Sequence, residues 1–196
     1  MVKRTAIRFP GHAARMAGAL YFASVAIGAC GELLVQGRLG FALVLLSILC
    51  SAGMTLLLFF LFNASSGILA ALAAAFNLVG LVPEVLQWHP RGVAIEMVFH
   101  ALYCIAIGWL ALRSRLLPAA LGLSMALAGA GWLTYLSPQL VHRLSPLNSA
   151  ASFVGEALFM LWLLVAGSSA ERGRFGTARH RANQTKASLY SGRRAG

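Results

Sequence analysis

Aspartate is absent from this 196-residue chain, and its only acidic residues are five glutamates. A Ser–His–Asp catalytic triad is therefore impossible. The sequence also contains no Walker loop, no HExxH motif and no GxSxG motif. A dinucleotide-binding glycine fingerprint is missing as well, because Gly129 and Gly131 lie inside an apolar run and follow no strand. These absences exclude the commonest soluble enzyme motifs.

Cysteine is scarce, and the three copies at positions 30, 50 and 104 stand singly within apolar segments. Without a CxxC pair, neither a disulfide framework nor a zinc ribbon is predicted. Residues 27–30 (IGAC) resemble a lipoprotein cleavage box, which would remove the first apolar segment up to Cys30. Because that apolar run continues to Val35, we favour an uncleaved first span.

Charge is also scarce, since only 11% of the residues are charged, 59% are hydrophobic and the mean hydropathy is +0.77. This composition excludes an ordinary soluble domain. The apolar residues form six blocks, each long enough to cross a hydrocarbon core as a helix, at 15–36, 40–62, 67–88, 92–112, 117–137 and 149–168. No alternating barrel pattern competes. We predict an all-α, polytopic transmembrane helical bundle with six spans.

The basic residues predict the orientation of this bundle. Thirteen Lys and Arg fall on the side of the two termini and three on the other side, so both termini are predicted to be cytoplasmic. This divides the chain into a basic N-terminus (1–14), a membrane domain (15–168) and a basic, disordered tail (169–196). Most of the net charge of +11 thus comes from basic residues of the predicted cytoplasmic side, including the tail. We therefore predict that the chain's partner is the lipid bilayer and not nucleic acid.

Several short stretches carry a resemblance to a known family. Residues 14–21 (ARMAGALY) open the first span, residues 113–122 (RSRLLPAALG) join the fourth span to the fifth, and residues 155–158 (GEAL) lie within the last. The chain resembles, over roughly residues 13–168, the bacterial multi-pass membrane protein family catalogued as domain of unknown function 4386. Compared with that family, it looks short through residues 37–66. The resemblance implies about six spans in a bacterial cytoplasmic membrane and no assigned activity.

Four of the five glutamates, Glu32, Glu84, Glu96 and Glu156, lie inside the apolar blocks. From a helical rise of about 1.5 Å per residue, each is about 6–10 Å inside the predicted outer boundary of its span. A carboxylate at this depth is costly and usually faces the protein interior. We therefore predict one layer of carboxylates near the outer leaflet.

The fourth span contains the densest group of polar residues. Glu96, His100 and Cys104 follow one another at four-residue spacing and share one helix face. Three interpretations stay open. Glu96 and His100 could simply satisfy each other's hydrogen-bonding groups, they could form a proton or cation site, or Glu96, His100 and Glu156 could form a metal site. Dimetal bundles use Glu-x-x-His on two helices, and this chain has no such pair.

The third and last spans supply the remaining candidates. Pro83 leaves the carbonyl of Val79 without its helical partner one turn below Glu84, and Asn77 shares the face of Glu84. Glu32 is a further candidate, although it could simply pair with Arg38. Glu156 has no basic neighbour in the sequence, which leaves Arg143 across the long outer loop as its candidate counter-ion.

The fifth span has a stripe of small residues, Gly122, Ala126 and Ala130, which predicts close helix packing in a central position or against other membrane subunits.

Three functions are consistent with the sequence patterns described so far. The carboxylate and His layer could handle a proton, a cation or a small polar ligand. Alternatively, the chain could be an accessory or assembly subunit, or a metal-dependent membrane enzyme.

Overall fold

The structure is a computed structural model that describes residues 11–33, 35, 37–86, 88, 93–114 and 117–165. All regular structure in these residues is helical. The elements are α1 (Gly11–Leu33), α2 (Arg38–Asn63), α3 (Gly67–Leu86), α4 (Ile95–Ser114), α5 (Ala119–Leu133), a 3-10 turn (Thr134–Leu136), α6 (Pro138–Leu144) and a last helix (Leu147–Val165). All except α6 belong to six helices that are long and apolar enough to cross a membrane, and α5 and the 3-10 turn together form the fifth of them, Ala119–Leu136. The predicted helical bundle is therefore confirmed.

The helix ends differ from the prediction in two places. Helix α1 begins at Gly11, inside the stretch that the sequence assigned to the N-terminal segment. The predicted connection 138–148 contains the short helix α6, where Pro138 occupies the first turn and needs no N–H partner. The predicted tail, 169–196, lies outside the described residues.

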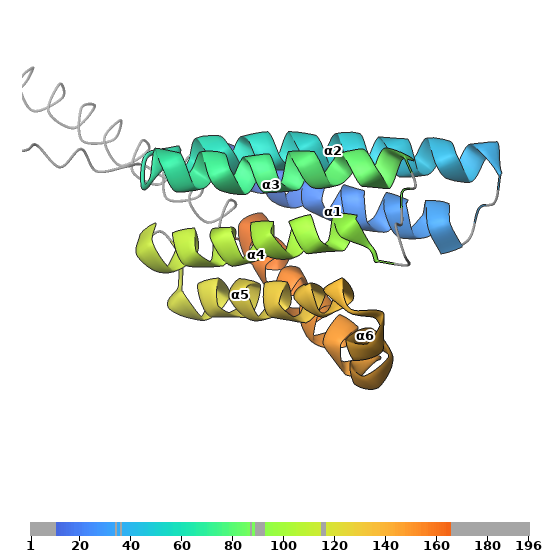
Figure 1. Ribbon diagram of the computed structural model, residues 1–196. Coiled ribbons are helices and arrows are strands. Elements are labelled where there is room, and N and C mark those ends of the chain that lie inside the picture. The colour runs from blue at the N-terminus through green and yellow to red at the C-terminus, as the bar shows by residue number, and fades with distance from the viewer. Residues whose placement is uncertain are drawn as a thin grey trace, which may run out of the picture.

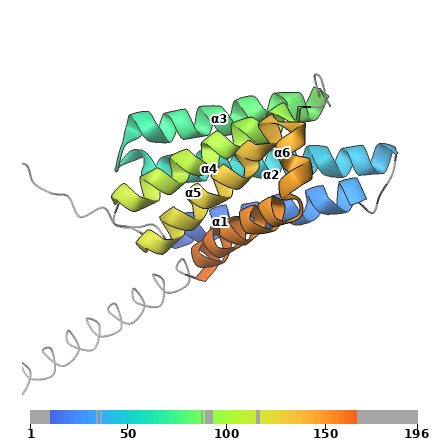
Figure 2. The same ribbon diagram turned by 60° about the horizontal axis from the view of Figure 1, so that its bottom comes forward.

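The helices are packed in a closed circuit (Figures 1 and 2). Each of α1 to α4 packs against the next helix along the chain. The last helix closes the circuit, because it packs against α5 through Ser152 and against α1, where Gly18 lies beside Leu163. Residues from the first and last spans thereby meet inside the bundle.

Small residues allow close approach of α4 and α5, as their stripe predicted. A Cβ atom on Gly108 would lie 2.7 Å from the carbonyl oxygen of Gly122 and 3.1 Å from the Cβ of Ala126. The backbones therefore touch at a distance that a larger side chain would prevent. Ala130, in contrast, is exposed. Helix α5 also packs on the last helix, so it has two neighbours, as the other helices of the circuit do.

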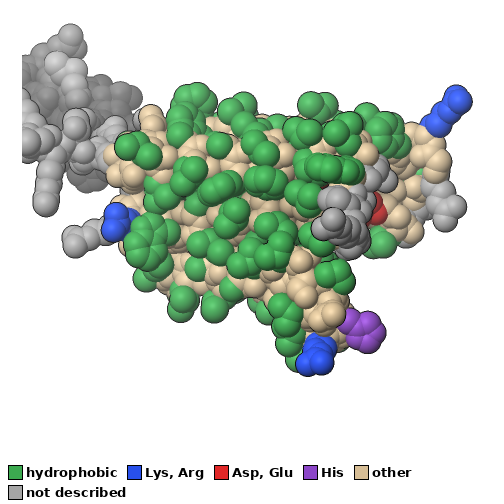
Figure 3. Space-filling view, in the orientation of Figure 1, with side chains coloured by type: hydrophobic (Ala, Val, Ile, Leu, Met, Phe, Trp, Pro, Cys, Tyr) green, Lys and Arg blue, Asp and Glu red, His purple; other side chains and the backbone are tan. Residues whose placement is uncertain are grey.

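Hydrophobic side chains cover the outside of the bundle (Figure 3). Leu49, Phe60, Ile68 and Leu127 are among the many large apolar residues that are exposed. Soluble monomers rarely expose apolar surface on this scale, whereas lipid tails solvate it. In the same view, the visible basic side chains lie at the left and right ends and on the projection at the lower right, and none lies over the middle of the apolar face.

Candidate functional site

A cavity of about 810 Å³ lies at the end of the bundle where α1 joins α2 and α3 precedes α4. It is lined by all six site residues that the sequence predicted: Glu32, Asn77, Glu84, Glu96, His100 and Glu156. These six residues come from four of the spanning helices: α1, α3, α4 and the last helix. The other two spanning helices, α2 and α5, contribute Ser51 and Trp132 to the lining. The intramembrane carboxylates therefore share one space.

The four carboxylates differ in their depth of burial along this cavity. Glu32 is exposed near the end of α1, and Glu84 and Glu96 are half-buried at the adjoining ends of α3 and α4. Glu156 is buried. The acidic lining thus runs from an exposed carboxylate to one enclosed by the bundle.

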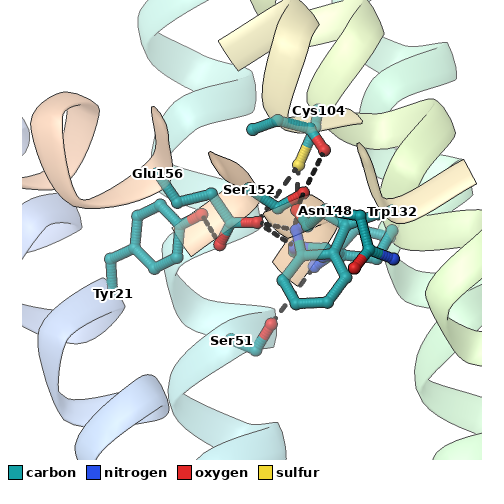
Figure 4. Close-up of polar contacts among 10 residues, drawn as sticks. Tyr21, Ser51, Cys104, Trp132, Asn148, Ser152 and Glu156 are labelled. Carbon is teal, nitrogen blue, oxygen red and sulfur yellow. Dashed lines mark hydrogen bonds and ion pairs between the residues drawn. The ribbon is translucent and has the colours of Figure 1, made fainter. Parts of the chain in front are cut away.

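Glu156 is held by polar side chains from three other helices (Figure 4). The Tyr21 hydroxyl donates a hydrogen bond to Oε2 at 2.6 Å, and the Trp132 indole N–H donates to Oε1. His100 Nε2 lies 3.0 Å from the same Oε1. Both carboxylate oxygens are therefore satisfied within the bundle, which offsets part of the cost of burial.

Asn77 fixes the other side of the His100 ring. The Thr55 hydroxyl donates to the carbonyl of Ser51 at 2.8 Å, so its oxygen accepts from Asn77 Nδ2 at 2.6 Å. Asn77 Nδ2 also lies 3.2 Å from the hydroxyl oxygen of Ser51. With its amide nitrogen used in this way, Asn77 turns Oδ1 toward His100 Nδ1, at the long distance of 3.5 Å.

Both ring nitrogens of His100 thus face oxygen acceptors. An imidazole that donates from Nδ1 to Asn77 presents a lone pair at Nε2, directly opposite the Glu156 carboxylate. Two acceptors 3.0 Å apart need a hydrogen atom or a cation between them. A proton on Nε2 meets this need and gives an imidazolium–carboxylate pair, which has no net charge.

Cys104 completes a group of three different ligand atoms. Its Sγ lies 3.6 Å from His100 Nε2 and 3.8 Å from Glu156 Oε1. These three atoms all lie within 4.8 Å of one another, and among the described residues they form the only such group. The predicted set of Glu96, His100 and Glu156 is therefore not the one brought to ligand distance: Glu96 lines the cavity, and Cys104 takes its place.

Neither of the two suggested ion pairs is formed between the described residues. Arg143 was the candidate counter-ion for Glu156, but it is exposed on α6, and His100 occupies that role instead. A pair between Glu32 and Arg38 is also not formed in the part of the chain that the structure describes. The buried Glu156 carboxylate is balanced by His100 of α4, which a search for Arg or Lys cannot find.

Sequence reasoning missed Tyr21 and Trp132 as site residues. Both are fully or almost fully buried, and each carries a polar atom that needs a partner in an apolar interior. Their presence within apolar spans was the available clue, because a buried indole N–H or phenol O–H implies a nearby acceptor.

Comparison with known proteins agrees with the sequence pattern. Residues 81–167 match the model of the family described as Domain of unknown function (DUF4386). This stretch, the DUF4386-like region, is similar to that family. The predicted resemblance is confirmed there, over a shorter stretch than the sequence suggested. No curated protein and no solved structure matches the chain significantly.

The DUF4386-like region contains only part of the site. It includes Glu84, Glu96, His100, Cys104, Trp132 and Glu156. Tyr21, Asn77 and Thr55, which contact the region's buried Glu–His pair or support it, come from the preceding helices. The pair at the centre of the site thus belongs to the family region, and its outer partners lie before it.

Proposed function

We propose that this membrane protein binds small cations in the cavity between its helices. The observation that carries the proposal is that all four intramembrane carboxylates line this one cavity. None of the described residues that line it is Lys or Arg. Walls of low dielectric strengthen the field of such a carboxylate group and favour positive over negative ligands.

The His100–Glu156 pair gives the cavity an exchangeable position at its buried end. The positive species between Nε2 and Oε1 is a proton in the absence of other cations, and a cation that reaches this point competes with it. Of the two side chains, 26% of His100 and 8% of Glu156 is exposed, so the pair is reached from the cavity through His100. We place this activity in a bacterial cytoplasmic membrane, as the family resemblance implies.

The test is cation-dependent stability of the full chain in lipid nanodiscs. Chlorides of Na⁺, K⁺, Mg²⁺, Zn²⁺ and methylammonium are compared at constant ionic strength. We expect at least one cation to raise the unfolding midpoint in a saturable manner, because a ligand at about 100 times its Kd stabilises the folded state by about 2.7 kcal/mol.

The matched controls remove carboxylates inside and outside the cavity. A Glu84→Gln/Glu96→Gln variant is expected to lose most of the stabilisation, whereas Glu171→Gln, which alters the one glutamate outside the predicted spans, is expected to retain it. If no cation stabilises the protein, or if the cavity variant responds like the unaltered chain, the proposal is wrong. The assembly-subunit alternative would then be preferred, although Gly122 and Ala126 of the predicted face already pack against α4.

A further inference from the structure

We propose that the buried end of the cavity is a transition-metal site in which His100 Nε2, Cys104 Sγ and Glu156 Oε1 bind a divalent ion of the Zn²⁺ type. The inference rests on the proposed function in one respect, because the cavity is the route by which the ion arrives. It goes further in naming the ligands and the class of ion, and in excluding Mg²⁺ and Ca²⁺ from this position.

The spacing of the three atoms fits a tetrahedral ion. Ligands bound at the usual zinc distances of about 2.0–2.3 Å lie about 3.3–3.6 Å from one another at tetrahedral angles. The corresponding distances here are 3.0 Å for N–O, 3.6 Å for N–S and 3.8 Å for S–O. Each differs from the ideal value by no more than about 0.4 Å, which small side-chain movements can supply.

The chemistry of the donor set selects the ion. A sulfur, a nitrogen and an oxygen ligand suit Zn²⁺ and related borderline ions, whereas Mg²⁺ and Ca²⁺ require mostly oxygen. A thiolate and a carboxylate together balance a divalent charge, and a neutral imidazole adds none. The occupied site would therefore have no net charge, which is the condition for a low cost inside a membrane.

The surrounding contacts resemble the outer support of known metal sites. Asn77 accepts from Nδ1 of His100, which directs the lone pair of Nε2 to the ion. Tyr21 donates to Glu156 Oε2, the carboxylate oxygen that does not face His100. Residues of α3 and α1 thus hold the two ligands His100 and Glu156 in place without the ion. Three protein ligands leave a fourth position for water or a small molecule, as in exchangeable and catalytic zinc sites.

The test is zinc X-ray absorption of the full chain in detergent or nanodiscs after addition of one equivalent of Zn²⁺. We expect one ion per chain, with a sulfur shell at about 2.3 Å and nitrogen or oxygen near about 2.0 Å. The Cys104→Ser variant should lose the sulfur shell and bind Zn²⁺ at least about tenfold more weakly. The chain supplies its own matched control, because Cys50→Ser alters a cysteine of α2 outside the group and should change neither property.

The outcomes separate this inference from the proposed function. Zinc without a sulfur shell, or unchanged binding by Cys104→Ser, would show that the metal site is wrong, while cation binding by the cavity would stand. Stabilisation by Na⁺, K⁺ or methylammonium but not by Zn²⁺ would lead to the same conclusion. If no cation of any kind binds, both proposals fail. Folding of each variant is checked by its elution as a single species and by its helical circular dichroism.

Discussion

Glu156 illustrates how a single carboxylate is accommodated inside a membrane bundle. Its two oxygens receive hydrogen bonds from Tyr21 and Trp132 and face His100, and these three residues come from three different helices. A buried charge that lacked them would cost several kcal/mol. The tertiary structure thus supplies what neither the local sequence nor the bilayer can provide.

The hydrogen bond from Tyr21 allows the first prediction. Tyr21→Phe removes only the hydroxyl that reaches Glu156, and we expect the free energy of unfolding to fall by about 1–2 kcal/mol. A double-mutant cycle with Glu156→Gln, measured by denaturation in mixed micelles, should give a coupling of similar size. Tyr135→Phe, whose hydroxyl lies 3.0 Å from Ser149, should give a coupling close to zero. Equal coupling for the two tyrosines would contradict the contact.

The residues of the site were only partly predictable from the sequence. The position of each carboxylate along its span identified it as a site residue, because a carboxylate inside the hydrocarbon core is costly unless it faces the protein interior. Depth does not give the rotation of a helix about its axis relative to its neighbours. The choice of Cys104 over Glu96 as the third group near His100 depends on that rotation and on which helix faces α4, and both are set by packing across the whole bundle.

Among the elements, α5 shows most directly how side-chain size determines helix position. A Cβ atom on Gly129 would lie 2.7 Å from the carbonyl oxygen of Ala101 in α4. The backbone of α4 cannot yield locally without moving the helix. The contact therefore fixes the distance between α4, which carries His100, and α5, which carries Trp132.

This contact leads to a prediction for glycine substitutions. Gly129→Ala should lower the unfolding free energy by roughly 1–3 kcal/mol because its methyl group overpacks the α4 interface. Gly53→Ala is the control, since its Cβ would meet only the flexible end of Leu20 at 3.2 Å. Both changes raise helix propensity by about 1 kcal/mol, so the difference between them isolates the packing cost. Similar stabilities of the two variants would argue against the close contact.

The elements themselves were largely predictable. Long apolar runs gave the number and order of the spanning helices because a bilayer permits few alternatives. The short helix α6 was missed: its seven residues form a segment too short for periodicity to distinguish from a loop. The pairing of the last helix with both α1 and α5 was also not predictable, since adjacency in sequence says nothing about how a circuit closes.

At the scale of the whole molecule, orientation in the membrane stays a prediction from the 13-to-3 distribution of basic residues. It places the cavity end, with α6, outside the cytoplasm. Fusions after residue 140 and at the C-terminus are expected to report opposite sides, with alkaline phosphatase active at the first and a fluorescent protein folded at the second. Signals from the same side at both positions would overturn the six-span topology.

The long sequence separation between Glu156 and Tyr21, 135 residues, has a consequence for biogenesis. A chain is synthesised from its N-terminus, so Tyr21, His100 and Trp132 leave the ribosome before the last helix does. The last helix, which carries the costly carboxylate, is thus inserted after the helices with Tyr21, His100 and Trp132, the residues that contact Glu156. The order of synthesis can spare Glu156 a solitary exposure to lipid, and ribosomal timing becomes part of how this site is assembled.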